Sequence, residues 1–174
     1  GFGRTGEWFA WQGLGEGHTA VVPDLVTFAK GVNSGYVPVG GVLISESIAN
    51  AFDAQVFPGG LTYSGHPLAM AAIVGRKRLE RGGEGPRQRA LRSEGVIENA
   101  RMIGAEHLGP GLAELAAKHP LIGEVRGLGV FWALDLVDDP ETRQPVSGGL
   151  VLELRKALLA RGLLPFTADN RIHV

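Results

Sequence analysis

The sequence has 174 residues, a formal net charge of −1 and no cysteine. The length fits one domain or two partial ones, and the near-neutral charge argues against a nucleic-acid or anionic-membrane binder. Disulfides and thiolate metal sites are excluded, and no apolar run approaches the roughly 18 residues that cross a bilayer. We therefore expect a cytoplasmic protein that has neither nucleic acid nor a membrane as its partner.

Glycine is unusually frequent, with 27 residues, about twice the average share of roughly 7%. The glycines interrupt apolar runs without periodicity, which indicates turns and close backbone approaches. The chain opens on Gly1 inside a glycine-rich loop and stops at Val174 inside an expected strand. We expect it to be a piece of a longer protein.

The first 20 residues are expected to be mostly loop. Residues 1–6 (GFGRTG) are weak evidence for a phosphate cradle, because no apolar strand precedes them and no P-loop lysine follows. An aromatic cluster, Trp8, Phe9 and Trp11, is more often core than a cofactor site.

The next stretch, residues 21–36 (VVPDLVTFAKGVNSGY), ends an apolar run at Lys30 and continues into a loop of Gly, Asn and Ser. Such a run is typical of a strand that is buried on both faces in a parallel sheet. Ligands collect beyond the carboxyl ends of such strands. A lysine there can attack a carbonyl cofactor, and burial would lower its pKa toward the nucleophilic form. The alternative is a solvated lysine at a strand end.

A second buried strand is expected at residues 38–45, and a short capped helix at 45–52. Thr62 and Ser64 then precede a helix that starts at Pro67. Hydroxyls and backbone N–H groups before a helix N-terminus can hold a phosphate. On local evidence, these hydroxyls serve equally well as helix caps.

Residues 76–95 break that helix with glycine and proline. Their arginines could contact nucleic acid, but no aromatic residues are interleaved, and a solvated or disordered loop is the better interpretation. A helical pattern resumes over residues 96–118, with an interruption at 109–111. Strands around 130–137, 163–166 and 171–174 and an amphipathic helix over 150–161 complete the chain. This alternation predicts the α/β class.

Four motifs occur in one order and span nearly the whole chain: residues 1–6 (GFGRTG), 23–31 (PDLVTFAKG), 59–69 (GGLTYSGHPLA) and 123–129 (GEVRGLG). With them the chain resembles the class III pyridoxal-phosphate aminotransferases, the ω-amino-acid or ornithine-type family on the fold type I scaffold. The resemblance implies part of the large-domain sheet in residues 1–92 and an incomplete small α+β domain in residues 93–174.

The resemblance also implies the site. Lys30 would hold pyridoxal 5′-phosphate as a Schiff base and then move a proton between the substrate Cα and the cofactor's C4′ carbon. Thr62 would bind the cofactor phosphate from the neighbouring subunit, so a homodimer is expected. For Arg4 and Arg126 we expect structural ion pairs rather than catalysis. Arg171 is either a binder of the substrate carboxylate or a surface residue.

The implied reaction transfers an amino group from an ω-amino acid or primary amine, of taurine or β-alanine type, to a 2-oxo acid such as pyruvate or 2-oxoglutarate. Aminomutases and racemases on the same fold keep the lysine, so they remain alternatives. The Asp that binds the pyridine nitrogen in the family lies upstream of the GFGR loop and has no counterpart in residues 1–174. We therefore expect this chain alone to be inactive, and a non-catalytic fragment or relic is the rival interpretation.

Overall fold

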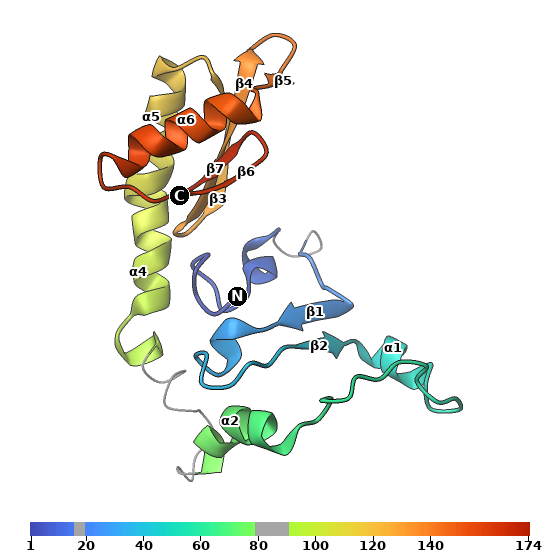
Figure 1. The fold of residues 1–174 in the computed structure, drawn as a ribbon. Coiled ribbons are helices and arrows are strands. Elements are labelled where there is room, and N and C mark those ends of the chain that lie inside the picture. Colours follow the sequence, from blue (N-terminus) through green and yellow to red (C-terminus); the bar gives the residue numbers. More distant parts are fainter. Residues whose placement is uncertain (16–19, 79–90) are drawn as a thin grey trace. The chain divides into compact units, whose positions relative to one another are not determined.

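The computed structural model describes residues 1–15, 20–78 and 91–174. These residues form two compact units, one of residues 1–2 and 11–96 and one of residues 3–10 and 97–174. The boundary that we expect between residues 92 and 93 remains a prediction. Helices and strands are mixed along the chain (Figure 1), and every strand pairing among the described residues is antiparallel.

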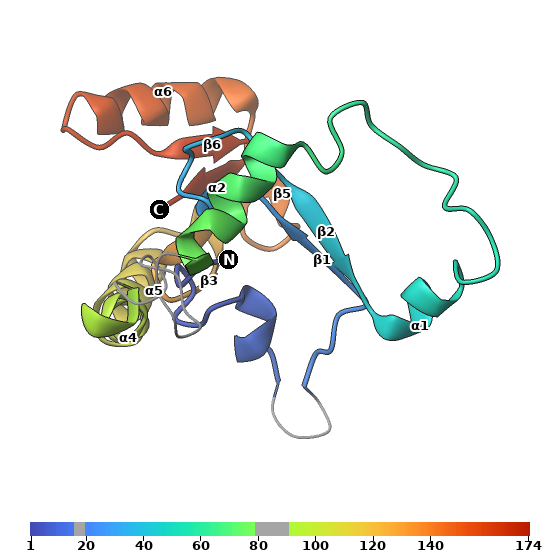
Figure 2. The ribbon, with the colours of Figure 1, turned by 90° about the horizontal axis from the view of Figure 1, so that it is seen from below.

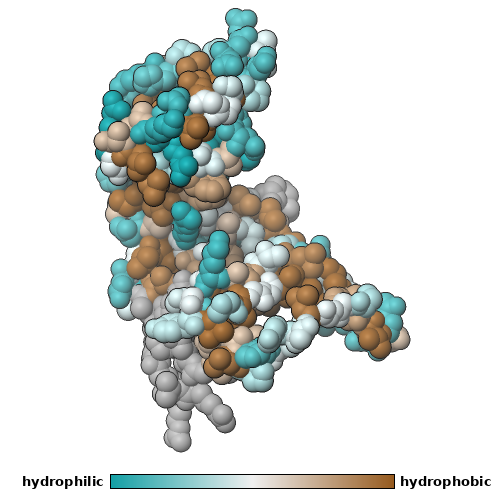
Figure 3. Space-filling view, viewed as in Figure 1, coloured by the Kyte–Doolittle hydropathy of each residue, from teal (hydrophilic) through white to brown (hydrophobic). Residues whose placement is uncertain are grey.

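The first unit contains a two-stranded antiparallel sheet of β1 (Leu25–Phe28) and β2 (Gly41–Ile44). The prediction of strands buried on both faces of a parallel sheet is therefore wrong. Leu25 is 57% exposed and Leu43 is 55% exposed, and apolar side chains lie at the surface around these strands (Figure 3). Among the described residues this sheet has two strands only, so its apolar side chains have no second layer to pack against.

Short helices complete the first unit. The 3-10 helix η1 (Ala10–Gly13) precedes the sheet, and α1 (Glu46–Asn50) follows it. Ser45 occupies the N-cap position of α1, as expected, but its hydroxyl donates to the Asp24 carboxylate at 3.3 Å instead of capping the helix. Helix α2 (Pro67–Arg78) begins at its proline as predicted, because the missing N–H of proline is not needed in the first turn.

The second unit begins its helical part with α4 (Val96–Ile103), a π-helical turn η4 (Gly104–Leu108) and α5 (Gly109–Lys118). The expected interruption at residues 109–111 falls earlier, in the π turn. Pro110 lies in the first turn of α5, where its missing N–H does not break the helix.

A five-stranded sheet is the centre of the second unit, with the order β3-β4-β7-β6 and β5 paired to β4. Its strands are β3 (Ile122–Leu128), β4 (Phe131–Asp139), β5 (Gln144–Pro145), β6 (Phe166–Ala168) and β7 (Arg171–His173). Helix α6 (Gly148–Leu159) lies against this sheet (Figure 2). Its side chains Val151, Leu154 and Leu158 pack on Leu136 and Ile172 to form the core.

Turn residues fix the ends of these elements. The Ser147 hydroxyl caps α6 by accepting the Leu150 N–H at 3.3 Å, and Gly162 follows the helix with φ +85°. After β4, the Glu141 N–H donates to the Asp139 carboxylate at 2.8 Å. This bond, together with the Thr142 hydroxyl, lowers the pKa of Asp139, because both donors stabilise the ionised form.

Two glycines in the second unit touch where the π turn meets the β3–β4 connection. A Cβ atom on Gly104 would clash with the carbonyl oxygen of Gly129. Because that oxygen belongs to the backbone, the clash could be relieved only by a shift of the main chain. Gly129 itself has φ +57°, and a Cβ there would lie 2.4 Å from the Thr5 carbonyl carbon. The N-terminal GFGRTG loop, the π turn and the hairpin therefore meet at positions where only glycine fits.

Replacing Gly104 with alanine should lower the free energy of unfolding by about 2 kcal/mol, because the added methyl group overpacks a backbone contact. Gly111→Ala is the matched control, since nothing lies within 4 Å of its Cβ position in α5. That control should be neutral or stabilise by up to about 1 kcal/mol through helix propensity. Urea unfolding of both variants measures the difference, and equal effects would contradict the close glycine contact.

Candidate active site

Lys30 lies two residues after β1, at the start of the 3-10 turn η3 (Lys30–Val32). Its φ of +42° places a non-glycine residue in the left-handed region, which strains the backbone by about 1 kcal/mol or more. The turn is closed by the Val32 N–H, which donates to the Ala29 carbonyl at 3.1 Å. The side chain of Lys30 is exposed, which agrees with the alternative of a solvated lysine at a strand end. Its amine forms no ion pair with any residue that the structure describes.

The loop after Lys30 is held by Asn33, which sequence reasoning missed. Asn33 is 2% exposed and is the one buried polar side chain in the described part of the chain. Its amide nitrogen donates to the Val37 carbonyl at 2.6 Å, and its amide oxygen accepts the Gly35 N–H at 3.0 Å. An Asn beside Ser and Gly signals a turn, but its burial could not be read from the sequence.

Thr62 lies in a turn before α2. The Ser64 N–H donates to the Leu61 carbonyl at 2.9 Å, and the Ser64 hydroxyl accepts the Leu61 N–H at 3.3 Å. The interpretation that Thr62 and Ser64 cap the helix is therefore wrong. His66 is the residue that caps α2, because its Nδ1 accepts the Ala69 N–H at 3.4 Å. The Thr62 side chain is exposed and has no hydrogen-bond partner among the described residues.

The structure does not bring the two predicted site residues into contact. No hydrogen bond joins Lys30 to Thr62 in the described ranges, although both belong to the first unit. Most of the basic stretch over residues 76–95, with Arg81, Arg87 and Arg89, lies outside the described residues. In the part that is described, no helix is long and apolar enough to cross a membrane, and no group of acidic and histidine side chains could hold a metal ion.

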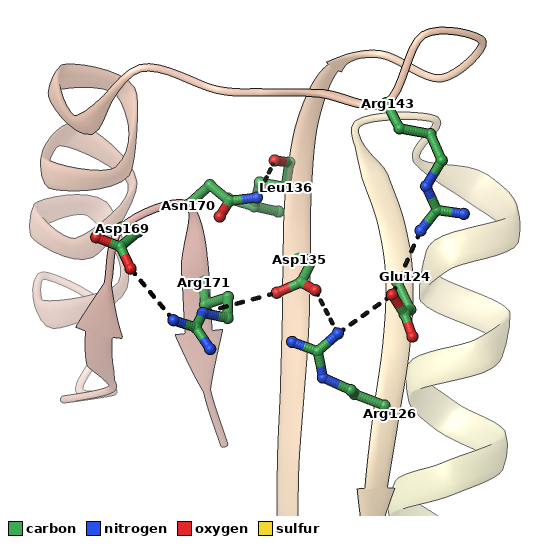
Figure 4. A network of polar contacts seen from close by, with 8 residues as sticks. All are labelled: Glu124, Arg126, Asp135, Leu136, Arg143, Asp169, Asn170 and Arg171. Carbon is green, nitrogen blue, oxygen red and sulfur yellow. Dashed lines mark hydrogen bonds and ion pairs between the residues drawn. The ribbon is translucent and has the colours of Figure 1, made fainter.

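Arg126 lies in a polar network on the β3–β4 hairpin (Figure 4). Glu124 and Asp135 are direct cross-strand partners, and two like charges in that position repel. One guanidinium nitrogen of Arg126 bridges them, at 2.6 Å from the Asp135 carboxylate and 3.2 Å from that of Glu124. The structural ion pairs that we expected for Arg126 are present.

The other two arginines singled out from the sequence are also engaged. Arg171 lies 3.2 Å from the Asp169 carboxylate and 4.0 Å from Oδ1 of Asp135, which is too far for a hydrogen bond. Its guanidinium therefore faces two carboxylates of this chain rather than an open site. Arg4 stacks on the Phe131 ring at 4.9 Å from the centroid, so its contact among the described residues is a cation–π interaction and not the expected ion pair.

Comparison with known proteins connects these observations. Residues 1–173 match the family model described as aminotransferase class-III. The chain belongs to the class III aminotransferase family. This confirms the resemblance drawn from the four motifs. Among relatives, the putrescine–pyruvate aminotransferase of Pseudomonas aeruginosa is 39% identical over 166 residues, which are 94% of this chain and 33% of that protein.

Two further class III relatives give the same result. The taurine–pyruvate aminotransferase of Bilophila wadsworthia is 35% identical over 94% of this chain and 34% of its own length. The crystal structure of the taurine:2-oxoglutarate aminotransferase of Bifidobacterium kashiwanohense, in complex with PLP and glutamate, superposes with a TM-score of 0.75 at 35% identity, covering 100% of this chain and 36% of that one. The α/β, fold type I prediction is thus confirmed. The aminotransferase chain described here spans about a third of the length of these relatives.

In this class III chain, Arg126→Ala should lower the free energy of unfolding by about 1 to 2 kcal/mol, because Asp135 loses its 2.6 Å partner while remaining largely buried. The matched control is Arg143→Ala, which removes an exposed guanidinium 3.3 Å from Glu124 and should change stability by no more than about 0.5 kcal/mol. Chemical unfolding measures both. A larger effect of Arg143→Ala would show that the bridge across Glu124 and Asp135 is not the stabilising contact.

Proposed function

We propose that residues 1–174 supply the cofactor lysine of a pyridoxal-phosphate-dependent transaminase. Its reaction moves an amino group from an ω-amino acid or primary amine to a 2-oxo acid such as pyruvate or 2-oxoglutarate. The observation that carries this proposal is the exposed amine of Lys30, which has no ion-pair partner among the described residues and lies within residues 23–31 of a class III chain. Relatives named for putrescine, taurine and pyruvate support this substrate class.

The residues present fit pyridoxal phosphate. An aldehyde condenses with an amine that is not engaged in an ion pair, and Lys30 meets that condition among the described residues, whereas Lys118 is bound to Glu114 at 2.6 Å and Lys156 to Glu153 at 2.7 Å. A phosphate needs hydrogen-bond donors, and the exposed hydroxyl of Thr62 has no competing partner in the described part of the chain. The α2 N-terminus follows it in sequence, and its dipole favours an anion.

Lys30 has three tasks in this mechanism. Its amine would hold the cofactor through the aldehyde carbon and would be freed for proton transfer once the substrate is bound. The free amine then removes the proton from the substrate Cα as a general base and returns a proton as a general acid. Pyridoxal phosphate, when bound, supplies the electron sink that makes that Cα proton acidic. Thr62 holds the phosphate and so fixes the distance between the cofactor and the amine of Lys30.

No hydrogen bond joins Thr62 to Lys30 in the described ranges, which supports a working unit in which the two residues of one chain serve different sites. We propose a homodimer in which Thr62 of one subunit binds the phosphate held beside Lys30 of the other. We also propose that the protein acts in the cytoplasm. Aminomutase and racemase activities use the same lysine, and they differ from transamination because they consume no 2-oxo acid as amino-group acceptor. A cofactor-free relic is the non-catalytic rival.

Borohydride reduction after incubation with pyridoxal phosphate tests the role of Lys30. The full polypeptide as its gene encodes it and the 174-residue chain are each reduced, digested and mapped for the pyridoxyl label. We expect the label on Lys30 of the full polypeptide, complete loss of that label in Lys30→Ala, and no loss in Lys118→Ala. Absence of label on Lys30 from both polypeptides would leave the relic as the better account.

Replacing Thr62 with valine removes one hydrogen bond to a charged phosphate and should weaken cofactor binding by roughly tenfold to a hundredfold. Thr62→Ser keeps the hydroxyl and should bind within a few-fold of the unsubstituted protein. Equilibrium dialysis of the full polypeptide against pyridoxal phosphate measures the two dissociation constants. Equal binding by both variants would remove Thr62 from the phosphate site.

A further inference from the structure

The loop over residues 30–37 adopts a backbone that its residue types do not favour on their own. Lys30, Ser34 and Gly35 all have left-handed φ angles, of +42°, +61° and +78°. Two of these residues carry a Cβ, and each such residue is strained by about 1 kcal/mol or more. A strained backbone persists only where surrounding contacts determine it, so something in this loop must hold it in place.

Asn33 provides that contact at the centre of the loop. Its side-chain oxygen binds the N–H of Gly35, which is the residue with the largest left-handed φ in the loop. The side-chain nitrogen binds the carbonyl of Val37, at the end of the loop. Its own carbonyl also accepts the Tyr36 N–H at 3.4 Å. One buried residue thus fixes three backbone groups on the C-terminal side of the lysine.

The burial of Asn33 makes these bonds directional. A buried amide without one of its hydrogen-bond partners costs about 1 to 3 kcal/mol of free energy, so alternative loop conformations that leave it unsatisfied are disfavoured. An amide offers both a donor and an acceptor on one planar group. Aspartate has the same shape but would present an oxygen to the Val37 carbonyl, which now lies 2.6 Å from the Asn33 nitrogen.

We infer that Asn33 is the positioning residue of Lys30: its side-chain amide locks the loop over residues 30–37 so that the lysine backbone stays in its left-handed conformation and the amine keeps one direction of approach. This inference rests on the proposed role of Lys30 and assigns Asn33 a task that acts through that lysine. Asn33 itself touches neither cofactor nor substrate. Because an error of about 1 Å in the placement of a reacting group can slow a reaction up to about a hundredfold, a loosened loop should show itself in the reactivity of Lys30.

The test compares two variants that disturb the loop by different routes. Asn33→Asp removes the donor to Val37. Gly35→Ala strains the turn through its φ of +78°, although nothing lies within 4 Å of the added methyl group. Matched controls are Asn99→Asp, at an exposed position of α4, and Gly148→Ala, where the Cβ position is open and φ is not left-handed.

The measurement is the rate at which borohydride traps pyridoxal phosphate on Lys30 in the full polypeptide, divided by the folded fraction from urea unfolding under the same conditions. The visible absorbance of the lysine-bound cofactor is titrated with pH in parallel. We expect the trapping rate of Asn33→Asp and Gly35→Ala to fall by roughly tenfold or more, with a shifted titration midpoint, and both controls to match the unsubstituted protein.

The outcomes separate the two proposals. Trapping at the unsubstituted rate and an unchanged midpoint in both loop variants would overturn the positioning role of Asn33 while the proposed function of Lys30 stands. A lower melting temperature with unchanged trapping per folded molecule would likewise overturn it, because it shows a merely structural residue. No label on Lys30 of the unsubstituted polypeptide would overturn the proposed function, and the positioning role with it.

Discussion

The side-chain amide of Asn33 is the interaction on which the candidate site depends. Among the described residues the amine of Lys30 has no ion-pair partner, and the backbone of Lys30 lies in a conformation that lysine rarely adopts. In a flexible loop this backbone would relax, and the amine would sample many directions. The buried amide bonds to Gly35 and Val37 select one loop conformation by making every other one leave a polar group unsatisfied. Conformational specificity, more than net stability, is what this contact contributes.

The second unit achieves order by a different means. Its five-stranded sheet and α6 bury an apolar core around Leu136, Val151 and Ile172, while glycines let three backbone segments approach more closely than any side chain allows. Charges on the hairpin are arranged so that Arg126 lies between two carboxylates that would otherwise repel. The class III motif at residues 123–129 therefore has a structural explanation in this chain. Its arginine neutralises a cross-strand pair, and Gly129 fits a backbone junction.

The first unit contains Lys30 and Thr62, the residues of the proposed site, and has little core of its own. Its strands β1 and β2 expose several apolar side chains, and the hydroxyl of Thr62 is likewise free in the described part of the chain. Surfaces of this kind are suited to association. The proposed homodimer would cover these surfaces, and in it Thr62 of one subunit would bind the phosphate beside Lys30 of the other.

The sequence by itself determined what local residue chemistry controls. Pro67 starts a helix and Gly162 follows one, since the first depends on a missing N–H and the second on φ. The family could also be identified from the sequence, because each of its motifs is a continuous run of residues. Tertiary structure decided what depends on neighbours across space. The apolar run before Lys30 is compatible with a buried parallel sheet and with an exposed antiparallel hairpin. An Asn-Ser-Gly turn is likewise compatible with an amide in water and with a buried one. Burial and strand pairing are set by residues distant in sequence, so local pattern alone could reveal neither the exposure of Lys30 nor the role of Asn33.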